Sequence, residues 1–239
     1  MLYQFATLGL APLLVAQGRY VRRVTPRLPE PPGARAGSAG AGRRLSVLIV
    51  GDSSAAGVGV LTQEEAISGQ LVSQLRPTFH VHWTLRAQTG YAIGEVVENL
   101  ETAPAETFDV ALISVGVNDV TGRTKSKRWN TEHARLIGLL KAKFGVQHVL
   151  LSSLPPMHRF PALPQPLRWY LGLRARQLNN MLRKIADADD QCELLEMDVP
   201  FESRYMAADG FHPGALAYSA WGRRAAGAIR RRLSASLAA

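Results

Sequence analysis

Short apolar runs recur along the chain from residue 45 onward, and each has the length of a single β-strand. The runs LSVLIV and VALISV are apolar without interruption, which is typical of central strands buried on both faces. The run FHVHWTL alternates apolar and polar residues, which favours an edge strand. The pattern predicts five strands, at residues 45–50, 79–85, 109–115, 148–152 and 192–197.

Longer segments separate these runs and have the apolar spacing of amphipathic helices. Because parallel strands need long crossover connections, the alternation predicts an α/β fold in three layers, with helices on both faces of a parallel sheet. Ligands bind beyond the carboxyl ends of the strands in such sheets, so the functional residues are expected there. The predicted helices lie at about 62–76, 91–103, 131–144, 168–188 and 214–233.

The first 25 residues are an apolar segment with a basic end. Residues 1–18 carry no charge, and RYVRR follows at 19–23. As a helix, the uncharged stretch would be about 27 Å long, which is marginal against a membrane core of about 30 Å. The segment can insert in a membrane or lie on it, pack on the body or be a secretory signal. Arginines after the apolar run do not fit a signal. If the run enters a membrane, they would keep the protein cytoplasmic, at the inner face of that membrane.

Residues 26–44 include PRLPEPPGARAGSAGAG, which is rich in proline, glycine and alanine and has no apolar periodicity. This composition predicts a linker, so the catalytic domain is expected to span residues 45–239. The total length of 239 residues fits one such domain.

The net charge of +9 is concentrated at the two ends of the chain. Residues 1–44 contribute +6 and residues 210–239 contribute +5, whereas residues 45–209 sum to -2. A nucleic-acid-binding protein needs basic groups on the working surface of its fold, so this distribution argues against a nucleic-acid partner. The single cysteine, Cys192, excludes a disulfide framework.

Two predicted strand ends carry the residue types of nucleophilic catalysis. Ser53 follows the first strand in GDSSAAGVG, where it can be a nucleophile, or where it or Asp52 can simply cap a helix. Asp209 and His212 follow the fifth strand. Their spacing lets the carboxylate hold one imidazole nitrogen while the other nitrogen accepts a proton from a serine hydroxyl.

Two further residues at strand ends can donate hydrogen bonds to an oxyanion. Asn118 follows the third strand and can present its amide there, or it can be an ordinary turn residue. Gly90 follows the second strand and can present its backbone N–H, or it can simply end the strand. His80 and His82 share a strand face, but no third ligand accompanies them, so no metal site is predicted.

Together these blocks resemble the SGNH hydrolases, also called the GDSL esterase/lipase family. GDSS at 51–54 resembles the serine block of the family, and GVND at 116–119 resembles the asparagine block. DGFHP at 209–213 resembles the Asp-x-x-His block, and Gly90 resembles the glycine of the glycine block. The similarity extends over roughly residues 45–230, with Ser54 in place of the leucine of the family name.

The resemblance implies roles for five residues. Ser53 would be the nucleophile, His212 the general base and acid, and Asp209 the residue that orients His212. The backbone N–H groups of Ser53 and Gly90 and the side chain of Asn118 would form the oxyanion hole. The family fold is a flavodoxin-like sandwich with five parallel strands in the order 2-1-3-4-5.

The predicted activity is hydrolysis of carboxylic esters, acyl or lipid-like, through an acyl-serine intermediate, with no cofactor and no metal. A sugar O-acetylesterase or an acyltransferase using the same residues is the alternative, and a non-catalytic α/β binding protein is a third possibility. The apolar, proline-rich segment at 155–170 can be an acyl-binding wall, a lid or a rigid surface connection. An apolar wall would favour an acyl ester over a sugar acetate.

Overall fold

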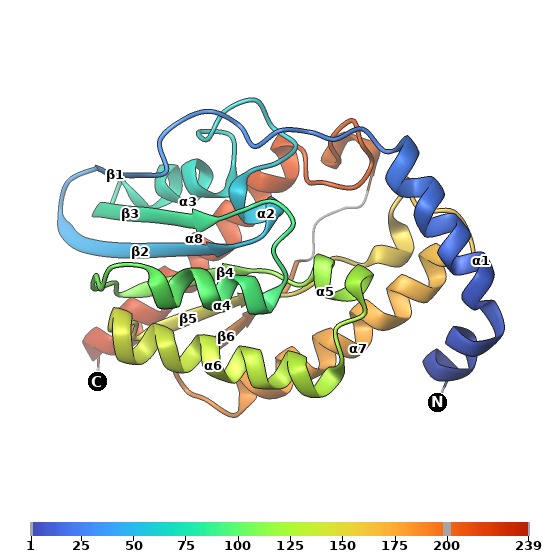
Figure 1. The fold of residues 1–239 in the computed structure, drawn as a ribbon. Helices are drawn as coiled ribbons and strands as arrows, with labels where there is room; N and C mark the ends of the chain where they lie inside the picture. Colours follow the sequence, from blue (N-terminus) through green and yellow to red (C-terminus); the bar gives the residue numbers. More distant parts are fainter. Residues whose placement is uncertain (1, 198–201, 239) are drawn as a thin grey trace.

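The computed structural model describes residues 2–197 and 202–238, and for 2–8 and 235–238 it describes the backbone alone, so the outer domain limits Met1 and Ala239 lie outside it. A six-stranded sheet with the order β1-β3-β2-β4-β5-β6 forms the centre of the molecule (Figure 1). The five predicted strands are all present, run parallel and are neighbours in the expected order. They are β2 (Arg43–Gly51), β3 (Phe79–Ala87), β4 (Val110–Ser114), β5 (His148–Ser152) and β6 (Cys192–Leu195).

The prediction of a five-stranded, all-parallel sheet is wrong by one strand. Strand β1 (Ala36–Ala39) pairs antiparallel with β3, so the sheet is mixed and β3 is not its edge. The Ser38 hydroxyl lies 3.1 Å from Nδ1 of His82, which links the two strands. β1 lies within the segment interpreted as a linker, and its sequence AGSA has no β-branched or aromatic residue that would indicate a strand.

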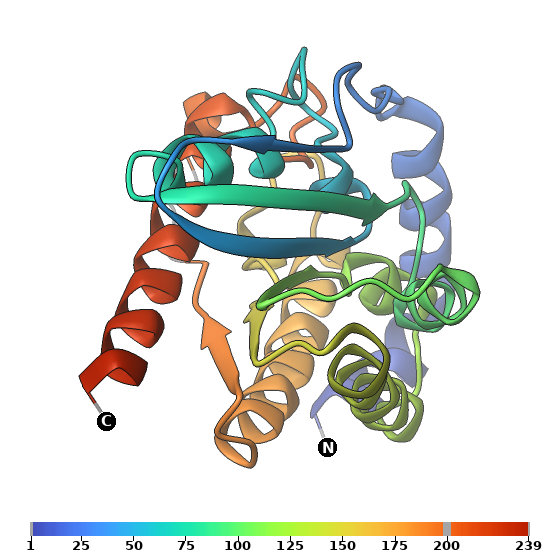
Figure 2. The same cartoon turned by 90° about the vertical axis from the view of Figure 1, so that its left-hand side faces the viewer.

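Helices cover both faces of the sheet, which confirms the three layers. In Figure 2, the red helix α8 lies on one side of the sheet, and the green to orange helices α4, α6 and α7 lie on the other. Each face has its own apolar core. The first face carries α2 (Ser53–Ala56), α3 (Ile67–Leu75) and α8 (Ala215–Ala238), and the second carries α4 (Ile93–Thr102), α5 (Val117–Gly122), α6 (Ser126–Phe144) and α7 (Leu167–Asp187).

The N-terminal segment forms the helix α1 (Leu2–Val24), which packs on α7 beyond the carboxyl ends of the strands (Figure 1). Leu14 and Val21, seven residues apart on one side of α1, are buried. Gln17 lies between them. Its Nε2 donates to the carbonyl oxygen of Gln165 at 2.6 Å, and its Oε1 accepts from the N–H of Leu167 at 3.0 Å. α1 therefore holds the beginning of α7.

Across the described ranges, 2–197 and 202–238, no helix combines the length and the apolar character that crossing a membrane requires.

Candidate active site

A sharp turn after β2 positions Ser53. Gly51 lies so close to β4 that a Cβ atom would be 1.8 Å from the carbonyl oxygen of Ser114, so only glycine fits. That oxygen also accepts from the N–H of Asp52 at 2.9 Å. Asp52 is the N-cap of α2, since its Oδ1 accepts from the N–H of Ser54 at 3.0 Å. The carboxylate of Asp52 makes the capping hydrogen bond, so the hydroxyl of Ser53 is not needed as a cap and can bind another partner.

That partner is His212, which comes from the loop before α8. Oγ of Ser53 lies 2.9 Å from Nε2 of His212, and Nδ1 of His212 lies 2.6 Å from Oδ2 of Asp209. The other carboxylate oxygen of Asp209 accepts from the N–H groups of Phe211 at 2.9 Å and His212 at 3.0 Å. The structure therefore brings together Ser53, His212 and Asp209 in one hydrogen-bonded chain.

The carboxyl group of Asp209 is held in its ionised form. Burial alone would raise its pKa, but hydrogen bonds from the His212 side chain and from the N–H groups of His212 and Phe211 bring the pKa below its usual value. An ionised acceptor on Nδ1 keeps the proton of a neutral imidazole on that nitrogen. The lone pair of Nε2 then faces the Ser53 hydroxyl, from which it can take a proton.

A second acid, Asp52, is buried beside this chain. The residue is 2% exposed. Burial raises its pKa to about 6, although hydrogen bonds from the N–H groups of Ser54 and Gly116 and the nearby His212 oppose the increase. The sequence identified Asp52 only as a possible helix cap. Its position directly after a buried strand is the signal that could have marked it as a buried acid.

Replacing Asp52 with asparagine is expected to stabilise the protein above pH 6. The folded protein keeps the Asp52 proton to a higher pH than the unfolded chain does, so this group makes the free energy of unfolding fall as the pH rises from about 4 to about 6. The asparagine variant retains an N-cap acceptor. Its free energy of unfolding does not fall in this way, because asparagine does not titrate. The variant's advantage should grow to roughly 3 kcal/mol by pH 7, as measured by urea unfolding.

Asp187→Asn is the matched control, because Asp187 is exposed at the end of α7. Its difference from the wild type should be small. A difference for Asp52→Asn that does not change with pH would contradict the expected titration of Asp52.

Asn118 and Gly90 follow the two strands that flank β2. Nδ2 of Asn118 donates to the carbonyl oxygen of Tyr91 at 2.9 Å, which ties the first turn of α5 to the residue after Gly90. An amide group has two donor hydrogens, and this bond uses one. Gly90 has a φ of +92°, in the left-handed region, with open space where a Cβ would lie. Its backbone conformation, and not a close contact, therefore favours glycine.

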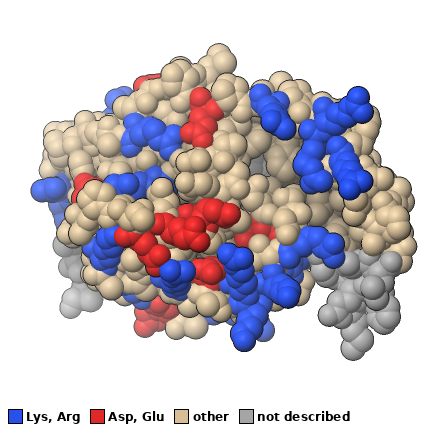
Figure 3. All heavy atoms as spheres, in the orientation of Figure 1, with Lys and Arg blue, Asp and Glu red and all other residues tan. Residues whose placement is uncertain are grey.

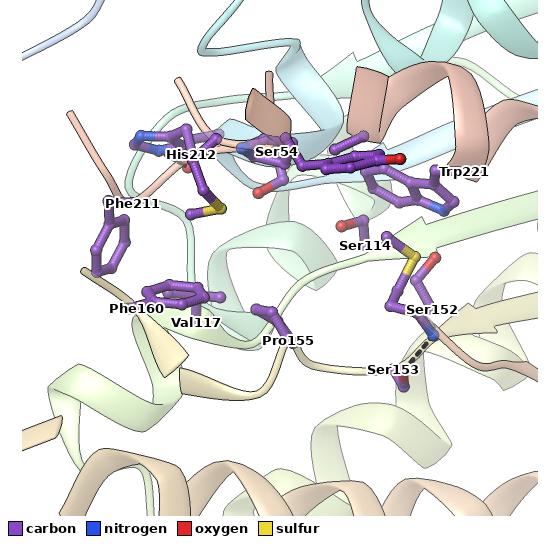
Figure 4. Close-up of a pocket in the computed structure, with 16 residues that line it drawn as sticks. Ser54, Ser114, Val117, Ser152, Ser153, Pro155, Phe160, Phe211, His212 and Trp221 are labelled. Atoms are coloured by element: carbon purple, nitrogen blue, oxygen red, sulfur yellow. Dashed lines mark hydrogen bonds between the residues drawn. The ribbon is translucent and has the colours of Figure 1, made fainter. Parts of the chain in front are cut away.

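Ser53 and His212 line a pocket at the carboxyl ends of the strands (Figure 4). The rings of Phe160 and Phe211 meet edge to face on its wall, with centroids 5.1 Å apart. Phe160 follows the short 3-10 helix η1 (Met157–Arg159), so the proline-rich segment at 155–170 contributes to this wall. Neither Gly90 nor Asn118 is among the residues that line this pocket.

Two buried residues that the sequence analysis did not identify hold the loops of the site. The Tyr218 hydroxyl lies 3.1 Å from the carbonyl oxygen of Ser54 and 2.8 Å from that of Val58. Oδ2 of Asp119 accepts from the N–H of Ile93 at 3.0 Å, at the beginning of α4, and burial raises its pKa. Asp119 directly follows Asn118, so its sequence position could have identified it as a residue of the site. Tyr218 had no such signal, because an aromatic residue within a helix is usually part of the core.

Among the described residues, no group of three or more histidine, cysteine, aspartate or glutamate side chains has the arrangement of a metal site.

Residues 49–220 match the GDSL-like lipase/acylhydrolase family. This range contains Ser53, Gly90, Asn118, Asp209 and His212. No curated protein sequence matches the chain significantly.

Solved structures of low sequence identity share the fold. A member of the lipolytic G-D-S-L family from Veillonella parvula has a TM-score of 0.61 at 16% identity, over 78% of this chain and 99% of its own. A psychrotrophic esterase from Pseudoalteromonas, inhibited by monoethylphosphonate, has a TM-score of 0.60 at 20% identity, over 79% and 98%. A carbohydrate acetylesterase from Sinorhizobium meliloti has a TM-score of 0.57 at 16% identity, over 78% and 99%.

Proposed function

Because this chain belongs to the GDSL-like lipase/acylhydrolase family and is a carboxylic ester hydrolase, we propose that it cleaves acyl esters through a covalent intermediate on Ser53. The observation that carries the proposal is the chain of hydrogen bonds from the Ser53 hydroxyl through both nitrogens of His212 to Asp209. Each member of this chain has the partner that nucleophilic catalysis requires.

In the first half of the reaction, Nε2 of His212 takes the hydroxyl proton as Oγ of Ser53 forms a bond to the ester carbonyl carbon. The ionised Asp209 stabilises the resulting imidazolium. When the tetrahedral intermediate collapses, the bond to the alcohol oxygen breaks, and His212 gives its proton to that oxygen. Water then attacks the acyl-Ser53 ester by the same proton transfers, which releases the acid and restores the serine.

The oxyanion of each tetrahedral intermediate needs donors that are already in place. We assign this role to the backbone N–H groups of Ser53 and Gly90 and to the side chain of Asn118. The bond from Asn118 to the Tyr91 carbonyl supports the assignment, because it fixes the amide beside the Gly90 turn and leaves one of its hydrogens available.

Asn118→Ala is expected to lower kcat by about 100 to 1000-fold with little change in KM, because an oxyanion donor acts mainly in the transition state. Thr121→Ala is the control, since Thr121 is exposed one turn further along α5. Steady-state kinetics on a p-nitrophenyl ester measure kcat and KM for both variants. A loss of less than about threefold in kcat for Asn118→Ala would remove Asn118 from the oxyanion hole.

The substrate is proposed to be an acyl or lipid-like ester, because Phe160 and Phe211 give the pocket an apolar wall. The second candidate is a sugar O-acetylesterase, which the structural likeness to the carbohydrate acetylesterase favours. An acyltransferase would use the same residues and differ only in the acceptor of the acyl group.

A fluorophosphonate probe and p-nitrophenyl esters of graded chain length test the proposed function. The wild-type protein is expected to be labelled covalently and to hydrolyse esters longer than acetate. Hydrolysis of the acetyl ester alone would favour the sugar O-acetylesterase, and transfer of the acyl group to an added alcohol in preference to water would indicate the acyltransferase. No labelling and no hydrolysis would overturn the proposal.

We also propose that the protein is cytoplasmic and contacts the inner face of a membrane. The contact would be made by the outer face of α1. Leu13, Tyr20 and Val24 are exposed there, at positions i, i+7 and i+11, and therefore form one stripe along the helix. The exposed Arg19 and Arg23 lie beside the stripe. Figure 3 shows basic side chains over this part of the molecule with no acidic side chain next to them. An apolar stripe with flanking arginines suits an anionic lipid surface.

Replacing Arg19, Arg22 and Arg23 with glutamine is expected to weaken binding to vesicles of phosphatidylserine and phosphatidylcholine by about 100-fold at low salt. Each arginine close to such a surface contributes roughly 1 kcal/mol. Cosedimentation measures the binding, and Ser53→Ala should bind as the wild type does.

The matched control replaces an equal number of exposed arginines at the amino ends of the strands, namely Arg43, Arg44 and Arg76, and should retain binding. Absence of wild-type binding, or equal losses in both triple variants, would remove the membrane contact from the proposal.

A further inference from the structure

The pocket beside Ser53 changes its chemistry from one end to the other. Figure 4 shows Phe160 and Phe211 near His212 at one end, and Ser114, Ser152 and Trp221 at the other. The end beside His212 is thus apolar and aromatic. The far end carries two hydroxyl groups and an indole nitrogen.

The alternation of side chains along the strands explains the polar far end. Leu112 of β4 and Leu150 of β5 are fully buried on the face covered by α3 and α8. Successive side chains of a strand point to opposite faces, so Ser114 and Ser152 are the next residues on that face. Each is the last residue of its strand. The apolar core therefore ends in hydroxyl groups, below Trp221 of α8.

Two polar atoms at this far end have no partner among the residues that the structure describes. Ser152 is 6% exposed and Trp221 is 2% exposed. Within the described part of the chain, neither Oγ of Ser152 nor Nε1 of Trp221 makes a hydrogen bond. The adjacent Ser153 differs, since its Oγ accepts from the N–H of Met197 at 2.8 Å. A buried donor without an acceptor costs about 1 to 3 kcal/mol, so the far end is suited to receive an oxygen atom.

We propose that this far end binds an acceptor oxygen of the substrate, so that the preferred ester carries an ether, hydroxyl or carbonyl oxygen in the group that fills the pocket. The indole N–H of Trp221 and the hydroxyl of Ser152 donate to that oxygen. A purely alkyl group leaves both donors unpaired and is disfavoured for that reason. The inference rests on the proposed ester hydrolysis, because attack by Ser53 places the substrate at the mouth of the pocket.

Pairs of esters of equal length test the inference and show which side of the ester enters the pocket. On the acyl side, p-nitrophenyl pentanoate is compared with the methoxypropanoate, in which an ether oxygen replaces one methylene group. On the alcohol side, pentyl acetate is compared with ethoxyethyl acetate. Each kcat/KM is divided by the rate constant of the same ester with hydroxide, which removes differences in intrinsic reactivity.

The ether ester is expected to have the higher corrected kcat/KM in one of the two pairs, by roughly threefold to tenfold, the effect of one net hydrogen bond. Ser152→Ala and, independently, Trp221→Phe should each reduce that ratio towards one, because each removes one of the two proposed donors. Ser54→Ala is the matched control, because it removes a hydroxyl from the pocket lining next to Ser53 and should preserve the ratio.

Hydrolysis of both members of each pair at equal corrected rates would overturn the inference and leave the proposed function standing. A preference for the ether ester that survives both Ser152→Ala and Trp221→Phe would also overturn it. Failure to hydrolyse any of the four esters, together with no labelling by the fluorophosphonate, would instead refute the proposed function.

Discussion

Ser53→Ala is expected to lower kcat for ester hydrolysis by about 10⁵-fold or more and to abolish labelling by the fluorophosphonate. Without Oγ, no acyl-enzyme can form, and the remaining rate comes from water attacking an ester held by the oxyanion donors. The fold should persist, because the cap of α2 is the carboxylate of Asp52 and not the Ser53 hydroxyl. Initial rates on p-nitrophenyl esters and a thermal melt measure the two effects separately.

Ser54→Ala is the control for this result, because it changes the adjacent hydroxyl. Ser54 takes part in the turn through its backbone, with its N–H donating to Asp52 and its carbonyl oxygen accepting from Tyr218. Alanine preserves both contacts, so the activity should stay within about threefold of the wild type. Loss of activity in Ser54→Ala with retention in Ser53→Ala would identify Ser54 as the nucleophile.

Asp209→Asn is expected to lower kcat by about 10⁴-fold while leaving the fold intact. An asparagine amide at the position of Oδ2 is a donor, so Nδ1 of His212 must become the acceptor. The imidazole proton then moves to Nε2, which can no longer accept the proton of Ser53. The remaining asparagine oxygen still accepts from the N–H groups of Phe211 and His212, as Oδ1 of Asp209 does. Pre-steady-state acylation rates test the prediction directly.

Asp190→Asn is the matched control, since Asp190 is exposed at the end of the loop before β6 and carries the same substitution. It should have wild-type kcat. If Asp209→Asn loses less than tenfold in kcat, Asp209 has only a structural role in its loop.

The apolar pattern was sufficient to predict the five parallel strands, because continuous runs such as residues 45–50 leave few alternatives to a buried strand. The order of the strands in the sheet could be predicted only from the family resemblance. The geometry of Ser53, Asp209 and His212 was also predictable, because parallel strands deliver their carboxyl ends to one edge and Asp209 lies three residues from His212.

Features that depend on tertiary contacts were not predictable from pattern. Strand β1 exists because β3 offers it an unpaired edge, and its four small residues carry no strand preference of their own. The raised pKa of Asp52 follows from its burial, which the sequence indicates only through the position of Asp52 directly after a buried strand. The lack of a partner for Ser152 and Trp221 among the described residues depends on how α8 crosses the strand ends.

The contacts of Gln17 also affect how the protein folds during its synthesis on the ribosome. Its two partners, Gln165 and Leu167, lie 148 and 150 residues further along the chain. At a synthesis rate of about 5 to 20 residues per second, roughly 8 to 30 seconds pass between translation of Gln17 and translation of its docking site. During that interval the face of α1 that later covers α7 has no native partner. The docking of α1 on α7 is therefore expected to be a late step in the folding of the chain.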